Sequence, residues 1–282
     1  MHFPKLNKLD LSTNIFFFPH ELMDYTPKTF KYLIVENTYH SLNTSYAEFL
    51  RLDYLIVNSN LLYKLTKNTP TCVKCFDTQY LTNLKILSIS NCSINIIEND
   101  AIKGFENLTS LNISKNALTT TPKEMFFDMP ALEILDISET EMVEIPDLSP
   151  LLNLRQLHMN TFKNIVNLID QGKFDTPLEK VEILSLKGNN LRKIMPEFLE
   201  NFPNLKELDL SYNRLNDLPD WPGQNKIIKL NLSNNKFTDV KSISSNFKSL
   251  ETLELCNNLI KHLTINDLIH LPVNLTVDNN CN

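Results

Sequence analysis

Apolar residues recur along the chain in short segments in which every second side chain is apolar. Leu108–Leu118 carries apolar residues at its first, fourth, sixth and eleventh positions and Asn116 at its ninth. Leu205–Leu215 repeats this spacing, with Asn213 at the ninth position. A period of two places alternate side chains on opposite faces of an extended segment. The pattern predicts a repeated unit with a short strand and a turn at the asparagine.

The same frame starts at twelve places, of which the last is degenerate. The starts are residues 6, 30, 52, 84, 108, 132, 154, 181, 205, 227, 250 and 272. Their mean spacing is about 24 residues, and they cover almost the whole chain. We therefore expect residues 1–282 to form a single array in which each unit packs against its neighbours.

The frame reads L-x-x-L-x-L-x-x-N-x-L, and on it the chain resembles the leucine-rich repeat superfamily from end to end. The resemblance implies an α/β solenoid, a curved horseshoe with a parallel β-sheet on its concave face. Short helices, 3-10 turns and loops would cover the convex face. Segments such as Ile97–Leu108 and Met195–Leu205 look like the 24-residue "typical" subtype, which is frequent in animal extracellular proteins such as Toll-like receptors. Intracellular scaffold repeats share much of the pattern, including Leu218-Pro219, so they stay open as an alternative.

The ninth position of the frame predicts a ladder of asparagines. An amide side chain both donates and accepts hydrogen bonds, so it can satisfy turn backbone groups that would each cost about 1–3 kcal/mol if left unpaired. Asparagine fills this position in eight copies: Asn14, Asn60, Asn116, Asn189, Asn213, Asn235, Asn258 and Asn280. Cys92 takes it in the fourth copy, and Thr38, Thr140 and Phe162 are weaker substitutes.

Composition excludes several other classes of protein. The chain has 46 Leu and 36 Asn but only four scattered Gly, too few for the glycine-rich phosphate loops of nucleotide-binding folds. No apolar run approaches the roughly 18 residues that span a bilayer, so we expect no membrane contact from this segment. The net charge of −6 argues against nucleic acid as a partner.

The sequence carries no catalytic or metal-binding motif. It has no H-E-x-x-H, no G-x-S-x-G and no clustered metal ligands, and its six histidines are dispersed. Only His158 falls on an expected concave strand, where a lone histidine is typical of an ordinary surface residue. We therefore expect no enzyme activity, no cofactor and no metal.

The spacing lengthens at two places. The first holds an insertion over residues 63–83 with Cys72-x-x-Cys75. Zinc requires four ligands, and no second pair or histidine cluster lies near in sequence; a redox site would require a thioredoxin-like context. A disulfide between Cys72 and Cys75 in an exported protein is the favoured interpretation. At the second, Ile165, Leu168 and Ile169 have helical spacing and suggest a short convex helix.

The cysteine count and the chain ends bear on the compartment. Five cysteines are an odd number, which predicts either a free thiol or a chain that continues further. Residues 278–282 contain Cys281, where extracellular family members often begin a Cys-rich C-terminal cap. With no export signal at the start, the chain is expected to be an internal piece of a longer protein. A cytosolic protein with five ordinary thiols is the alternative.

One set of concave positions is apolar. The third and fifth positions of copies two to four place five side chains on neighbouring strands about 4.8 Å apart: Tyr32, Ile34, Tyr54, Ile56 and Ile86. Exposed patches of this kind often mark partner sites, and tyrosine is enriched among binding hot spots. The alternative is that this surface packs against a preceding segment or the loop after residue 62.

The rest of the concave face is expected to be polar and solvated. Eight acids and four lysines at concave positions give it a net charge of −4, which disfavours nucleic acid and permits a basic protein partner. Candidate glycosylation sequons begin at Asn43, Asn91, Asn107, Asn112, Asn231 and Asn274. Their number is what the Asn, Ser and Thr content produces by chance. Glycans at Asn112 or Asn231 would restrict binding on the concave face.

These observations predict a non-catalytic protein-binding module. The resemblance implies recognition of a protein ligand or partner receptor, with possible dimerisation, in an extracellular Toll-like or related innate-immune receptor. An intracellular scaffold or adaptor is the alternative.

Overall fold

The structure, a computed structural model, describes residues 4–14, 24–38, 47–67, 75–162, 176–219, 226–241, 243, 247–269, 271 and 274–276. The chain divides into two compact units, Met1–Asn153 and Leu154–Asn282. We call them the first and second unit and describe each by itself. The predicted Ile165–Ile169 helix and Asn280 lie outside the described residues.

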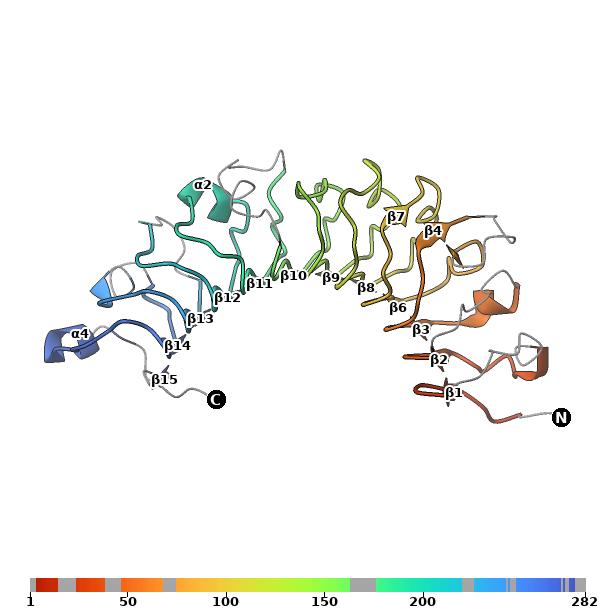
Figure 1. The fold of residues 1–282 in the computed structure, drawn as a ribbon, viewed down its shortest axis with the longest axis horizontal. Helices are drawn as coiled ribbons and strands as arrows, with labels where there is room; N and C mark the ends of the chain where they lie inside the picture. The colour runs from red at the N-terminus through yellow and green to blue at the C-terminus, as the bar shows by residue number, and fades with distance from the viewer. Residues whose placement is uncertain are drawn as a thin grey trace. The chain divides into compact units, whose positions relative to one another are not determined.

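The first unit contains a parallel sheet of three-residue strands in the order β1-β2-β3-β6-β8-β9 (Figure 1). The strands are β1 (Lys8–Asp10), β2 (Tyr32–Ile34), β3 (Tyr54–Ile56), β6 (Ile86–Ser88), β8 (Ser110–Asn112) and β9 (Ile134–Asp136). The register pairs equivalent positions of successive repeats, as in Leu33 with Leu55 and Leu55 with Leu87. A 3-10 helix, η2 (Ala47–Arg51), precedes β3.

The second unit repeats this arrangement in the order β10-β11-β12-β13-β14-β15. The strands are β10 (Gln156–His158), β11 (Ile183–Ser185), β12 (Glu207–Asp209), β13 (Lys229–Asn231), β14 (Thr252–Glu254) and β15 (Asn274–Thr276). The described α-helices are only one turn or slightly longer: α2 (Pro196–Leu199) and α4 (Ile265–Ile269). Parallel sheets with little helix confirm the predicted leucine-rich repeat solenoid.

The alternation of the frame accounts for the core. In β2, β3, β8 and β9 the central leucine is buried while the residues on either side are partly exposed. Phenylalanines between strands, such as Phe105 and Phe198, are fully or almost fully buried as well. The third and fifth positions of each repeat therefore remain on the open face of the sheet.

The asparagines of the frame bond to the turn backbone. In the first unit, Asn116 Oδ1 accepts from the backbone N–H of Cys92 and of Ile94, both at 3.0 Å, and its Nδ2 donates to the carbonyl of Ile89 at 2.9 Å. In the second unit, Asn213 Oδ1 accepts from Asn189 and Leu191 in the same way. Asn60, Asn189, Asn235 and Asn258 also bridge two repeats. Asn14, at an exposed position, donates to Leu11 and Ser12 of its own turn.

The residue before each of the eleven described ninth positions adopts a left-handed conformation. These residues have φ between 52° and 71° and are Thr13, Asn37, Ser59, Asn91, Lys115, Glu139, Thr161, Gly188, Tyr212, Asn234 and Asn257. For a non-glycine residue this conformation costs on the order of 1–2 kcal/mol. The backbone N–H groups at this position continue the ladder beyond the strands, as when Lys115 donates to Ser138 at 2.9 Å. The inter-repeat bonds thus hold the turn with few glycines.

The insertion forms part of a second parallel sheet in the first unit. Its strands, in the order β5-β4-β7, are β4 (Lys64–Thr66), β5 (Cys75–Asp77) and β7 (Ile96–Ile97). In Figure 1, β4 and β7 lie on the opposite side of the unit from the row formed by β3, β6 and β8. Cys72 lies outside the described residues, as does the side chain of Cys75, so their disulfide stays a prediction.

Candidate functional site

The five apolar side chains on the open face of the first unit lie on three neighbouring strands. The sheet pairs Tyr32 with Tyr54 and Tyr54 with Ile86, and it pairs Ile34 with Ile56. The two tyrosine rings stack with centroids 4.2 Å apart and planes within 14° of parallel. All five side chains are half-buried. We call this set, Tyr32, Ile34, Tyr54, Ile56 and Ile86, the apolar patch.

Polar residues on the neighbouring strands border the apolar patch. The strand on one side, β1, presents Lys8 and Asp10, and the strand on the other, β8, presents Ser110 and Asn112. Because both neighbours are polar at the same positions, the patch ends sharply at β2 and β6.

Polar groups also lie just before and just after the patch strands in sequence. Asp53 bridges Lys31 at 3.2 Å and Lys85 at 3.3 Å. Burial raises the pKa of Asp53, but hydrogen bonds from the two lysines outweigh it and leave the pKa below its usual value. Beyond the strands, Asn58 donates to Glu36 at 2.7 Å. An apolar centre within a polar rim is the anatomy of protein–protein interfaces.

The structure shows where part of the loop after residue 62 lies, which is one segment that could have packed against the apolar patch. The described insertion residues in β4 and β5 belong to the second sheet with β7, and the patch side chains remain half-exposed. The hydroxyl of Tyr54 raises the pKa of Tyr32 through a hydrogen bond, which agrees with the stacked pair.

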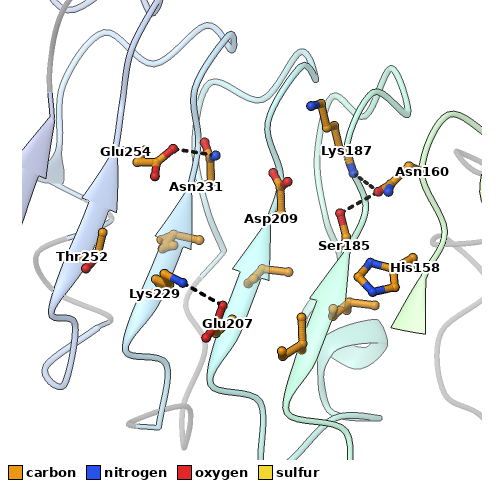
Figure 2. Close-up of a pocket in the computed structure, with 14 residues that line it drawn as sticks. His158, Asn160, Ser185, Lys187, Glu207, Asp209, Lys229, Asn231, Thr252 and Glu254 are labelled. Carbon is orange, nitrogen blue, oxygen red and sulfur yellow. Dashed lines mark hydrogen bonds and ion pairs between the residues drawn. The ribbon is translucent and has the colours of Figure 1, made fainter. Parts of the chain in front are cut away.

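The open face of the second unit carries a groove of about 450 Å³ across β10 to β14 (Figure 2). The polar side chains that line it are His158, Asn160, Ser185, Lys187, Glu207, Asp209, Lys229, Asn231, Thr252 and Glu254. We call this the polar groove. His158, the one histidine expected on a concave strand, lies on β10 at its margin (Figure 2).

Most polar side chains of the groove already bond to one another or to the backbone. Lys229 pairs with Glu207 at 3.1 Å, and Asn231 donates to Glu254 at 2.7 Å (Figure 2). Lys187 lies over the ring of Tyr212, 4.8 Å from its centroid. The groove therefore offers few unpaired groups to a ligand.

Several acids and amides at the fifth position hold the turn that follows their strand. Asp209 Oδ1 accepts from the backbone N–H of Ser211 at 2.8 Å, and Asn231 does the same for Ser233. Asp10, Asn112 and Asp136 repeat the bond in the first unit. Some of the acids that make the predicted concave face negative therefore already accept hydrogen bonds from the backbone. The recurring Asp/Asn-x-Ser spacing is the sequence signal for this role.

The cysteines differ in state. Cys92 is free and buried, and burial raises the pKa of its thiol to about 11. Cys256 is disulfide-bonded and buried. Cys281 lies outside the described residues. Across the described stretches, no three His, Cys, Asp or Glu side chains gather as a metal site would require.

The predicted sequons differ in accessibility. Asn91, Asn107 and Asn274 are exposed, while Asn112 and Asn231 lie partly buried on the open faces. The Asn231 amide is already bonded to Glu254. Asn43 lies outside the described residues. Because its side chain is exposed, Asn107 is a more accessible glycosylation site than Asn231.

Comparison with known proteins adds the family. The leucine rich repeat model matches residues 82–142, 106–161 and 179–222. This match agrees with the repeated frame, the parallel sheets and the asparagine turns. The chain has the repeats and the fold of leucine-rich repeat proteins. None of its described helices is long and apolar enough to cross a membrane.

The leucine-rich repeat chain resembles Toll-like receptors in sequence and fold. It is 30% identical to Toll-like receptor 2 type-2 of Gallus gallus over 208 residues, which cover 70% of the chain and 25% of the receptor. The structure of a TLR13–ssRNA13 complex matches 93% of the chain with a TM-score of 0.71 and 22% identity, and 37% of the matched chain is covered. A Drosophila Toll–Spätzle complex matches 94% with a TM-score of 0.67 and 19% identity, covering 40% of the matched chain. The chain thus spans well under half of each of these proteins.

Proposed function

We propose that this leucine-rich repeat chain is a non-catalytic protein-binding module of an extracellular innate-immune receptor related to Toll-like receptors. The observation that carries the proposal is the apolar patch of the first unit, with its stacked tyrosine pair and polar rim. Burying such a patch under a partner removes apolar area from water at about 25 cal/mol per Å². The stacked rings are ordered before binding, so little entropy is lost there on association.

Two further observations support an extracellular location. Disulfides persist in oxidising compartments and are rare in the cytosol, and Cys256 is disulfide-bonded. The matched Toll structure is a complex with the protein Spätzle, and the matched relatives include a Toll-like receptor. The nature of the ligand, a protein ligand or a partner receptor, is part of the proposal.

Binding to an array of animal secreted and cell-surface ectodomains tests the function. The full chain is compared with Tyr54→Ala in the apolar patch and with Thr252→Ala in the polar groove. Hot-spot tyrosines contribute about 2 kcal/mol or more, so the patch variant should lose about 30-fold in affinity for a true partner. The groove variant should bind like the wild type. If both variants lose the same affinity for a partner, or if neither loses any, the apolar patch is not the binding site.

Differential alkylation tests the compartment in protein from its native source. Under denaturing conditions without reductant, Cys92 should be alkylated and Cys256 should remain protected until reductant is added. Alkylation of all five cysteines without reductant would instead support the intracellular scaffold.

A further inference from the structure

A second hollow in the second unit is lined almost entirely by cations. It measures about 400 Å³ and is lined by Arg192, Arg214, Asn216 and Lys236. All four side chains are exposed. The residues lie just after the ninth positions of three successive repeats, on the flank that follows the asparagine turn, so they belong neither to the apolar patch nor to the polar groove.

The backbone register places these cations together. The N–H of Arg214 donates to the carbonyl of Leu191, the residue before Arg192, at 2.7 Å. The N–H of Lys236 donates in the same way to Leu215, the residue before Asn216, also at 2.7 Å. The first residue after the asparagine of one repeat therefore lies beside the third residue after the asparagine of the previous repeat. The cluster follows from the inter-repeat ladder.

Among the described residues, the cations of this cluster form no ion pair, unlike other cations in the second unit. Arg155 and Lys206 pair with Glu182, and Lys229 pairs with Glu207. Within the described part of the chain, no carboxylate forms an ion pair with Arg192, Arg214 or Lys236, and none lines the hollow.

Two acids lie close in sequence but bond elsewhere. Asp217 accepts from the backbone N–H of Leu218 at 2.9 Å, and Asp239 accepts from that of Lys241 at 3.1 Å. The three neighbouring exposed cations repel one another weakly in water, and an anion bound between them would relieve that repulsion.

We propose that this hollow binds a sulfated oligosaccharide. Arginine presents a planar fork of N–H donors that matches the oxygens of sulfate groups bidentately, and lysine adds a point charge. The Asn216 amide can donate to and accept from sugar hydroxyls. The hollow is open to solvent and its four lining side chains are exposed, which suits a ligand that lies along the surface rather than one enclosed in a cavity. Single-stranded nucleic acid is disfavoured, because its binding sites stack bases on aromatic side chains and none of the described residues that line this hollow is aromatic.

Fluorescence anisotropy with a labelled, fully sulfated heparin hexasaccharide tests the site on the full chain. The variant Arg214→Gln/Lys236→Gln should bind about ten-fold more weakly at 50 mM salt than the wild type. The slope of log affinity against log salt concentration should become less steep by about 1.5, because the two removed cations no longer release counterions from the ligand. The matched control Lys206→Gln/Lys229→Gln removes the same charge from paired lysines and should change affinity less than two-fold. Equal thermal midpoints for both variants ensure that folding is intact.

Three competitor arms identify the ligand class. The desulfated hexasaccharide and inorganic sulfate should fail to displace the probe at concentrations where the sulfated hexasaccharide does. Tighter binding of a single-stranded oligoribonucleotide of equal charge would overturn the proposal in favour of nucleic acid. If the two double variants lose the same affinity, the effect comes from net charge and not from this hollow. If the wild type does not bind the hexasaccharide, the site is refuted outright.

Discussion

The apolar patch and the polar groove use the same third and fifth positions of the repeat, yet they present opposite surfaces. In the first unit these positions carry stacked tyrosines and isoleucines with their polar partners at the rim. In the second unit these positions are mostly polar, and Glu207, Asp209, Lys229, Asn231 and Glu254 bond to one another or to the turn. Because the frame fixes the backbone equally in both, the difference lies in side chains alone.

A polar surface is not necessarily available to a ligand, because its polar groups can already be bonded to one another. A ligand at the polar groove would have to replace hydrogen bonds that already exist, so its net gain per contact would be small. A ligand at the apolar patch gains from desolvation without breaking bonds at its centre. A hollow lined by bonded polar groups can therefore be a poorer protein site than an exposed apolar surface.

The largest expected effect comes from placing a charge in each surface. Ile56→Lys should weaken partner binding by at least about 100-fold, since a partner would have to desolvate an unpaired ammonium in the patch centre. The matched Thr252→Lys in the polar groove should change affinity less than about three-fold. Surface plasmon resonance on both variants measures the contrast, and a larger loss for Thr252→Lys would reverse it.

A smaller effect concerns folding. Asp209→Ala removes the acceptor for the Ser211 N–H and should lower the free energy of unfolding by about 1 kcal/mol. Asp209→Asn keeps the acceptor, as Asn231 does naturally, and should lie within a few tenths of the wild type. Urea unfolding measures both variants. If the two lose equal stability, Asp209 acts through its charge and the backbone role assigned to it is wrong.

The ion pair in the polar groove should be weaker still. A double-mutant cycle on Glu207 and Lys229, each changed to Ala, should give a coupling of about 0.2–1 kcal/mol, as for other solvent-exposed pairs. Raising the salt from 0.05 to 0.5 M should reduce this coupling by screening. A coupling above about 2 kcal/mol would show that the groove is more rigidly organised than its exposure indicates.

The smallest effect is a pH dependence at the rim of the apolar patch. The folded pKa of Asp53 is below its usual value, so its stabilising contribution is present above the unfolded pKa and is lost as the pH falls through the folded value. The thermal midpoint of Asp53→Asn should therefore fall less steeply than that of the wild type as the pH is lowered from 5 to 3. Parallel curves for the two proteins would remove Asp53 from the acid response.

The sequence predicts the features that recur with the frame. The spacing of 22 residues from Tyr32 to Tyr54 and 32 from Tyr54 to Ile86 still places these three side chains in one row, because the frame counts positions within repeats rather than along the chain. The asparagine turn follows from the same count. Both depend on a pattern repeated many times over, which makes them readable from residues alone.

The features that the sequence leaves out do not recur. The second sheet joins β4, β5 and β7, which are two or three residues long and share no motif, so only the folded chain brings them together. The left-handed eighth position holds residues as unlike as Thr161, Gly188 and Tyr212, because backbone bonds rather than side chains impose it. The cluster combines Arg214 and Lys236, at the variable tenth position of the frame, with Arg192, which lies just past the end of its frame.

Hydroxyl-radical footprinting of the complex with a partner shows which surface of the chain the partner covers. Tyr32 and Tyr54 report on the apolar patch, and Tyr212, which is 55% exposed and contacts Lys187, reports on the second unit in the same sample. If the apolar patch is the binding site, Tyr32 and Tyr54 become protected on binding while the labelling of Tyr212 stays unchanged. Protection of Tyr212 with unchanged labelling of Tyr32 and Tyr54 would place the partner on the second unit instead.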